Sequence, residues 1–235
     1  MTRAMVRGVD GCVAGWLAIW VDPNGGQPSS RVFPDASSLF ASDDWAVTAV
    51  DIPIGLPTHG PRECDVAARR LLRDRRSSVF PAPLRCTLSA NTYEEACELS
   101  ARASGGKKLS KQAFAILPKI RQIDDFLRRE RSRSATVHEV NPEACFTYWN
   151  GGQPMQYAKR SGFGFVERFR LVEQAFPGCA ERFRNEHPAN QVSDDDILDA
   201  LAALWTALRL HKSSAIRIGP EGTRDEVGLE MSMWA

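Results

Sequence analysis

The sequence has no long apolar segment. None of its hydrophobic runs approaches the ~18 residues that a membrane-spanning helix needs. The first residues also lack the apolar stretch of a signal peptide, so we expect a cytoplasmic protein that does not enter a membrane. Low-complexity breaks are absent too. The 235 residues are 43% hydrophobic and 25% charged, which predicts one soluble globular domain.

Closely spaced cysteine pairs are also absent. Six cysteines are spread along the chain, and no two of them form a Cys-x-x-Cys pair. Zinc sites use ligand pairs at short spacing, and disulfide frameworks occur mainly in small secreted chains. We therefore expect six reduced thiols, most of them buried.

Several common nucleotide-binding and catalytic patterns do not occur in the chain. There is no P-loop and no Ser-His-Asp spacing. Gly8, Gly11 and Gly15 are not spaced as in the Gly-x-Gly-x-x-Gly fingerprint. A dinucleotide-binding fold is therefore excluded.

The small net charge of +1 conceals an uneven distribution along the chain. Residues 102–133 carry ten Lys and Arg against three acids, and residues 62–85 carry seven Arg against three acids. Residues 181–199 carry six acids against two Arg. Solvated helix faces give similar counts, but a basic surface near an acidic cluster also suits a polyanion handled with metal ions.

The pattern of apolar residues predicts strands first and then an alternation of strands and helices. Strands are expected over residues 5–10, 16–21, 31–33, 46–51 and 136–140, with a last one near 229–234. Helices are expected over residues 36–41, 62–73, 92–104, 110–131, 142–149, 164–176 and 193–211, the fourth of them kinked at Pro118. This order is typical of an α/β fold with a mixed sheet flanked by helices. A helical insertion is expected at about residues 84–134.

Two aspartates are notable because each ends a predicted strand. Asp10 is followed by Gly11, where the chain can turn sharply, and Asp51 ends an apolar run that reads as a central strand. An ionised carboxylate in such a place is costly unless it is paired, hydrogen-bonded or bound to a cation. Ligands also collect at strand ends in α/β sheets. A loop-capping role for each aspartate remains the structural alternative.

A further group of acids opens the last predicted helix. Ser193 and Asp196 have the spacing of a capping box, and acids in a first turn favour the helix dipole. Capping does not explain Asp199, which shares a helix face with Asp196. The same stripe continues as Ala200, Ala203 and Ala207, small residues that would let the helix approach a sheet closely.

Together these acids predict a metal site. Asp10, Asp51, Asp196 and Asp199 could hold two Mg²⁺ or Mn²⁺ ions, because hard cations take oxygen ligands. A two-metal site activates the attacking water and stabilises the leaving oxygen of a phosphodiester. Glu139, in the predicted strand over 136–140, is a further candidate ligand.

A series of motifs along the whole chain is similar to one known family. The motifs are Gly8-Val9-Asp10-Gly11-Cys12 with Gly15-Trp16, Asp51-Ile52-Pro53-Ile54-Gly55-Leu56-Pro57, Arg62 with Cys64-Asp65 and Ala68-Arg69, Arg75 with Ser77-Ser78-Val79-Phe80-Pro81, Lys119-Ile120, His138-Glu139-Val140 with Pro142-Glu143, Asp195-Asp196 with Leu198-Asp199-Ala200, and Gly228-Leu229-Glu230-Met231. They resemble a prokaryotic domain-of-unknown-function family described as predicted ribonuclease H-like nucleases. The resemblance implies a ribonuclease H-like fold with acids of the first strand, the fourth strand and the C-terminal helix around metal. Those acids correspond to Asp10, Asp51 and the pair Asp196 and Asp199.

The leading hypothesis is a metal-dependent nuclease. Asp10, Asp51, Asp196 and Asp199 would hold Mg²⁺ or Mn²⁺, with Glu139 assisting the hydrolysis of a nucleic acid. The residues expected to meet the backbone phosphates are Arg62, Arg69, Arg75, Ser77, Ser78 and Lys119.

Two alternatives stay open. A non-catalytic nucleic-acid-binding or regulatory protein of the same fold would bind through the basic stretches without needing metal. The second alternative is a nucleotide-dependent phosphotransferase. Sugar-kinase-like ATPases usually have a duplicated domain, and 235 residues are few for that.

Overall fold

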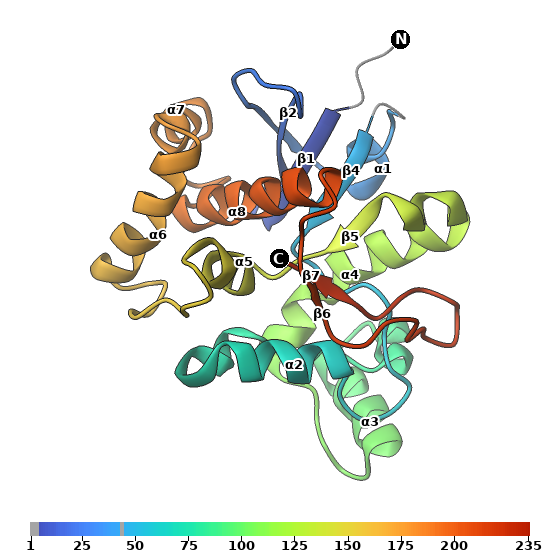
Figure 1. The fold of residues 1–235 in the computed structure, drawn as a ribbon. Helices are drawn as coiled ribbons and strands as arrows, with labels where there is room; N and C mark the ends of the chain where they lie inside the picture. The colour runs from blue at the N-terminus through green and yellow to red at the C-terminus, as the bar shows by residue number, and fades with distance from the viewer. Residues whose placement is uncertain (1–4, 43–44) are drawn as a thin grey trace.

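A five-stranded mixed sheet forms the centre of the computed structural model, which describes residues 5–42 and 45–235 (Figure 1). The strands lie in the order β3-β2-β1-β4-β5. Their bounds are β1 Met5–Cys12, β2 Gly15–Val21, β3 Ser29–Phe33, β4 Trp45–Val50 and β5 Val137–Glu139. β2 is antiparallel to its neighbours β1 and β3, whereas β4 and β5 run parallel to β1. The predicted α/β class with a mixed sheet is therefore confirmed.

Helices and 3₁₀ turns fill the connections around this sheet. The helices are α1 Ala36–Leu39, α2 Glu63–Leu71, α3 Tyr93–Ser104, α4 Lys111–Arg129, α5 Pro142–Trp149, α6 Gly162–Ala175, α7 Cys179–Glu186 and α8 Asp194–His211. The 3₁₀ turns are η1 Arg73–Ser78, η2 Arg85–Ser89 and η3 Arg131–Ala135. Two short strands, β6 Arg217–Ile218 and β7 Met233–Trp234, pair with each other near the C-terminus.

One face of the sheet is covered by α8, which crosses in front of β1 and β4 (Figure 1). The small residues predicted to allow a close approach do so: a Cβ at Gly8 would lie 2.0 Å from the Leu204 nitrogen and 2.3 Å from the Ala200 oxygen. Only glycine fits at position 8, because helix and strand backbones touch there. This contact fixes how far α8 stands from the end of β1.

The opposite face of the sheet packs against α1 and α4. Val9, Trp16 and Val50 share a core there with Ile120 and Ile123 of α4. The helix continues through Pro118, although proline removes one hydrogen bond from a helix interior.

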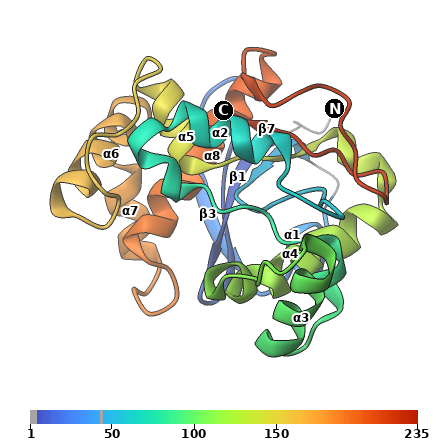
Figure 2. The same ribbon diagram turned by 90° about the horizontal axis from the view of Figure 1, so that it is seen from below.

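The region between β4 and β5 is helical and partly separate from the sheet. α3 lies at the outside of the molecule in both ribbon views (Figures 1 and 2). Its buried residues Ala96 and Cys97 share a small core with Ala113 and Leu117 of α4. The first half of α4 thus packs on α3, and its second half packs on the sheet.

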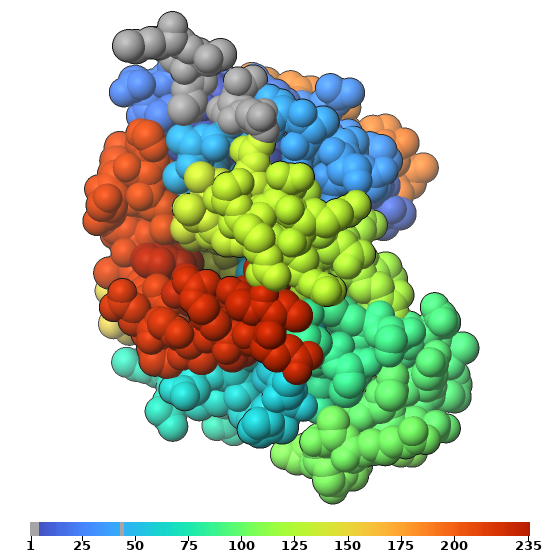
Figure 3. Space-filling view, turned by 90° about the vertical axis from the view of Figure 1, so that its right-hand side faces the viewer, coloured from blue at the N-terminus to red at the C-terminus, as the bar shows by residue number. Residues whose placement is uncertain are grey.

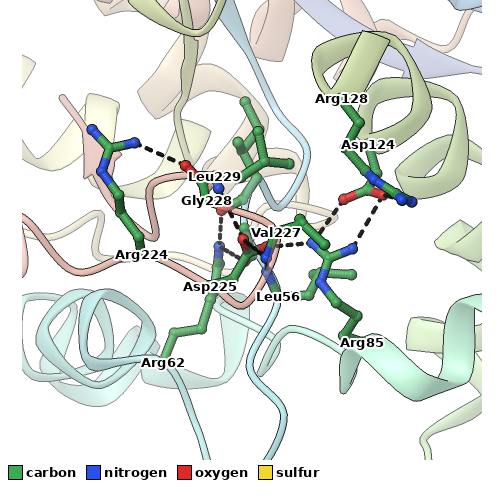
Figure 4. Close-up of polar contacts among 12 residues, drawn as sticks. Leu56, Arg62, Arg85, Asp124, Arg128, Arg224, Asp225, Val227, Gly228 and Leu229 are labelled. Carbon is green, nitrogen blue, oxygen red and sulfur yellow. Dashed lines mark hydrogen bonds and ion pairs between the residues drawn. The ribbon is translucent and has the colours of Figure 1, made fainter. Parts of the chain in front are cut away.

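The C-terminal segment is fastened to this helical region through Asp225 (Figure 4). The Asp225 carboxylate accepts the backbone N–H groups of Leu56 at 2.9 Å and Leu229 at 2.8 Å. It also forms an ion pair with Arg85, which donates to Asp124 at 2.8 Å. As a result the C-terminal segment (red) lies against the segment over 120–140 (yellow-green), with a hollow of about 620 Å³ beside them (Figure 3).

Several predicted elements differ from the structure in length. The predicted strand near 229–234 is reduced to Met233–Trp234, and the helix predicted over 62–73 gives way to 3₁₀ structure after Leu71. The helix α7 was not predicted, because Gly178 at its N-cap offers no side chain to signal a start.

All six cysteines are free, and five of them are buried, with Cys86 the exposed one. In the part of the chain that the structure describes, no helix combines the length and the hydropathy needed to cross a bilayer.

Candidate active site

A cleft of about 560 Å³ opens where β1 and β4 end. Its floor carries Asp10 of β1, Asp51 directly after β4, and Asp199 of α8. Its walls include residues 77–83, which are the end of η1 and the loop after it, and the stretch over 158–160 before α6. These two segments lie near each other in both ribbon views (Figures 1 and 2). The cleft thus brings together acids from three elements that are far apart in sequence.

The backbone explains why these three aspartates meet. Parallel pairing of β1 with β4 continues to the Asp51 N–H, which donates to the Val9 carbonyl at 3.0 Å. The close approach of α8 at Gly8 brings the first turns of that helix beside the same strand ends. Asp10 and Asp199 are 7% and 5% exposed, whereas Asp51 is half-buried. The site therefore holds carboxylates that water reaches only poorly.

Burial and mutual repulsion make these carboxylates difficult to ionise. Burial, followed by the charges of Asp199 and Asp51, raises the pKa of Asp10 well above its ordinary value. Burial and the Asp199 charge raise the pKa of Asp51 to about 8, and burial raises the pKa of Asp199 to about 6 despite a nearby ammonium. Clusters of this kind are common at functional sites.

The nearby ammonium belongs to Lys159. Its Nζ donates to Asp199 Oδ2 in a close ion pair. Its charge also offsets part of the rise in the pKa of Asp10 and of Asp51. The other carboxylate oxygen, Asp199 Oδ1, is buried and has no hydrogen-bond partner. One lysine thus faces three aspartates and leaves one buried oxygen without a partner.

The donor atoms of this cluster are suited to a hard divalent cation, although they are not yet arranged around one. Within residues 5–42 and 45–235, no group of three His, Cys, Asp or Glu side chains is placed to hold a metal ion. Carboxylate oxygens are nevertheless the ligands that Mg²⁺ and Mn²⁺ take, and Asp199 Oδ1 is available. The residues present therefore fit such an ion in chemistry and charge, provided that Lys159 leaves Asp199.

Asp196 is not among the described residues that line the cleft, although its charge contributes to the raised pKa of Asp10. Its side chain accepts the Ser193 N–H at 2.8 Å and completes the capping box of α8. Among the described residues that line the cleft, its place is taken by Asp195, one full turn before Asp199. The capping box fixes the phase of the helix, so the cleft-facing pair is Asp195 and Asp199 rather than Asp196 and Asp199.

Glu139 and Arg62 line the cleft but are already bound to each other. Arg62 donates to both oxygens of Glu139, at 2.6 and 2.7 Å, and to both oxygens of Asp65. Its remaining N–H donates to the carbonyls of Ile54 and Gly55. Every donor of Arg62 is used, so the prediction that it meets phosphate does not agree with the structure. Glu139 likewise has both oxygens engaged and is not a free ligand.

Arg69 also has a structural role in place of the predicted phosphate contact. It donates to the Val79 carbonyl at 2.6 Å and so holds the loop that forms one side of the cleft. It is not among the described side chains that line the cleft.

The other predicted contact residues do line the cleft. They are Arg75, Ser77, Ser78 and Lys119. Arg75 is half-buried and its Nε has no hydrogen-bond partner. Lys119 donates to the Gly15 carbonyl and lies 4.8 Å from the Trp16 ring. A Cβ at position 11 would lie 2.7 Å from its Cδ, so glycine leaves the space that this lysine occupies.

A protein-family model matches the part of the chain that carries most of the cleft residues. A family model described as "Protein of unknown function (DUF429)" matches residues 8–224. The chain belongs to the DUF429 family. No curated protein and no solved structure matches it. The matched segment of this DUF429 protein contains Asp10, Asp51, Lys159 and Asp199, but the family description names no reaction.

Three cleft residues of this DUF429 chain were missed by sequence reasoning. Lys159 and Arg160 belong to an irregular stretch, and no local pattern links them to acids some forty residues away. Asp195 could have been found, because the predicted capping box already assigned Asp196 to the helix start.

Proposed function

We propose that this cleft hydrolyses phosphodiester bonds of nucleic acid with the help of Mg²⁺ or Mn²⁺. The observation that carries the proposal is the imbalance of the buried cluster. Three aspartates face Lys159, with Lys119 also within reach of Asp10, and Asp199 Oδ1 has no partner. Buried carboxylates without enough counter-charge are costly, so a protein that keeps them gains something from their charge.

Asp10, Asp51 and Asp199 would hold the cation in this proposal. Asp195 stands at the edge of the same cleft and could bind through water. A bound divalent cation supplies a more acidic water and stabilises negative charge on the phosphate oxygens. The chain contributes a buried site that excludes bulk water and fixes the ligands on a strand, a strand end and a helix.

Basic and hydroxyl groups around the carboxylates support a phosphate-bearing substrate. Arg75 and Arg160 line the cleft, and the hydroxyl groups of Ser77 and Ser78 lie on the same side as Arg75. Arginine is suited to phosphate because its planar fork donates two parallel hydrogen bonds. These groups would position the backbone, while the carboxylates lie at the bottom of the cleft.

The resemblance to predicted ribonuclease H-like nucleases is consistent with this arrangement. It implies acids from the first strand, the fourth strand and the C-terminal helix, and Asp10, Asp51 and Asp199 come from β1, the end of β4 and α8. We therefore propose a ribonuclease H-like nuclease fold for the chain. Because one fold hosts many functions, the proposal depends on the site rather than on the fold.

The test is a cleavage assay on labelled DNA and RNA, each with Mg²⁺, with Mn²⁺ and with EDTA. We expect products with the metals and none with EDTA. The Asp10→Asn and Asp51→Asn variants should lose cleavage, whereas Asp74→Asn, which changes an exposed carboxylate outside the cleft, should cleave as the wild type does. Cleavage that persists in Asp10→Asn would contradict the proposal.

The Lys159 ion pair favours a second candidate, a nucleic-acid-binding protein that needs no metal. In that case Lys159 would be the permanent counter-ion of Asp199. Salt-sensitive binding of nucleic acid that is the same with EDTA and with Mn²⁺, without any product, would support this candidate.

A further inference from the structure

Three exposed aromatic side chains belong to, or directly adjoin in sequence, the segments that line the cleft. Phe80 lines one side and is 45% exposed. Tyr157 and Phe163 flank the stretch over 158–160 on the other side, and they are 41% and 74% exposed. Their rings contact each other, with centroids 5.3 Å apart and planes tilted by 35°. Large apolar groups left in water beside a cleft are typical of a binding surface.

The segment that carries Phe80 is held rigidly by hydrogen bonds on both sides of that residue. Arg69 donates to the Val79 carbonyl at 2.6 Å, and the Ala82 N–H donates to Asp65 Oδ2 at 2.9 Å. Pro81 restricts the backbone between these two contacts. Phe80 is therefore held in its exposed position before any ligand arrives.

The opposite aromatic pair is held by a buried ion pair. Arg168 is fully buried and donates to both oxygens of Glu143, at 2.7 and 2.6 Å. The same guanidinium donates to the Gly164 carbonyl at 2.7 Å and, more weakly, to the Tyr157 carbonyl at 3.4 Å. The loop with Tyr157 and the first turn of α6 with Phe163 are thereby fastened to each other.

Basic side chains accompany the aromatic residues, and the aspartates lie deeper in the cleft. Arg75 lies on the side of Phe80, and the exposed Arg160 lies on the side of Tyr157 and Phe163. Between them, Asp10 and Asp199 are at most 7% exposed. In a nucleic-acid duplex the phosphates lie on the outside of a wide cylinder. A single nucleic-acid strand can instead enter a cleft and turn its bases outward.

We propose that the substrate of this cleft is single-stranded nucleic acid, with bases stacked on Phe80 and on the pair Tyr157 and Phe163 while the backbone passes between them. The inference rests on the proposed function for its cleavage step, but binding of the strand does not need that step. Aromatic platforms beside basic groups are the usual means of holding single strands, because every base has a stacking face. Arg75 and Arg160 would contact the phosphates between the stacked bases.

The test measures binding separately from cleavage. A fluorescent oligonucleotide of about 12 nucleotides, the size that such surfaces cover, is titrated with the protein by anisotropy, as a single strand and annealed to its complement. Titrations are made in EDTA, where metal-dependent cleavage is off, and again with Ca²⁺. We expect the single strand to bind at least about tenfold more tightly than the duplex in one of these conditions.

Substitutions at the rim then assign the binding surface. Phe80→Ala and Phe163→Ala should each weaken single-strand binding by about tenfold, and Phe80→Trp should retain it. Ile216→Ala changes an apolar residue that is 40% exposed, similar to Phe80, and does not line the cleft, and it should bind as the wild type does. Thermal unfolding of each variant checks that the fold is retained.

The outcomes separate this inference from the proposed function. If the single strand binds through Phe80 and Phe163 but no metal-dependent product forms, the inference holds and the nuclease proposal fails. If cleavage occurs but duplex binds as tightly as single strand, or the aromatic variants bind as the wild type does, the inference is overturned and the nuclease proposal stands. Failure of the single strand to bind in both conditions also overturns the inference.

Discussion

Two groups of buried charged side chains line the same cleft, and they differ in how completely their charges and hydrogen bonds are paired. In the first, Arg62 lies between Glu139 and Asp65 with all of its donors used. Burial alone would lower the pKa of Arg62, but the two carboxylates raise it well above its ordinary value. In the second, the positive charge of Lys159 lies near three aspartates, and the buried Oδ1 of Asp199 has no hydrogen-bond partner.

The comparison separates a structural group from a functional one. A buried ion pair whose hydrogen bonds are complete can hold a loop, a strand and a helix in place, and removal of either partner is costly. Carboxylates that repel each other contribute little to folding, so neutralisation of one of them should be tolerated. The Arg62 group thus supports the cleft, and the Asp10 group is the part that a ligand would complete.

The largest expected effect of breaking the acidic group is on activity. Asp10→Asn keeps the shape of the side chain but removes its charge, so cleavage should fall by more than about 100-fold, because even groups outside the ligand set typically cost 10- to 100-fold. The thermal stability of this variant should be equal to or higher than that of the wild type, since repulsion is relieved. Loss of both activity and fold would show instead that Asp10 is a structural residue.

The largest expected effect on stability comes from breaking the Arg62 group. Arg62→Met leaves two buried carboxylates without a counter-charge, which should lower the free energy of unfolding by about 3–5 kcal/mol. Urea unfolding measures the change. The exposed Arg76→Met provides the matched control and should stay close to the wild type. A wild-type midpoint for Arg62→Met would mean that this group does not support the cleft.

A smaller effect is expected from removing the lysine of the acidic group. Lys159→Met deletes the cation that competes for Asp199, so Mn²⁺ should bind about tenfold more tightly, within the usual range of coupling between ligands. The metal-free variant should also be less stable than the wild type, and Mn²⁺ should restore the lost stability. Weaker Mn²⁺ binding in this variant would show that Lys159 assists the ion rather than competing with it.

A further expected effect is a dependence of stability on pH. Burial and neighbouring charge raise the pKa of Asp51 to about 8 and burial raises that of Asp199 to about 6, from an ordinary value of 3.8. The folded state therefore holds protons that the unfolded state has released, and stability must fall as pH rises through this range. Urea unfolding in EDTA from about pH 4 to about pH 8 should show a steady loss of stability, with no further loss from these two groups above about pH 8. Asp51→Asn should flatten the curve, and an unchanged slope in that variant would contradict the assignment.

The sequence predicted the sheet and the main helices because their signals are local. Alternation and short apolar runs marked the strands, and the alanine stripe of α8 predicted the close contact between helix and sheet, which the structure shows at Gly8. Asp10, Asp51 and Asp199 were found because each occupies a strand end or a buried helix face. Their gathering in one cleft follows from the order of the strands.

The remainder of the site depends on contacts between distant residues, which local patterns do not contain. Arg62 was taken for a phosphate ligand, but its partner Glu139 lies 77 residues away. Lys159 has no periodic context and reaches Asp199 across 40 residues. Asp196 was chosen over Asp195 because its spacing of three from Asp199 was weighed above the predicted capping box, and the capping hydrogen bonds in the structure show that the capping box was the better guide.

The most direct test of the central claim is a calorimetric titration of Mn²⁺ into the wild type, Asp199→Asn and Asp74→Asn. The account predicts saturable binding to the wild type and to Asp74→Asn, and loss of that binding in Asp199→Asn, whose fold should be retained. Binding that is the same in all three proteins would contradict the claim that the buried carboxylates form a cation site. The absence of binding both from the wild type and from the Lys159→Met variant would contradict it too.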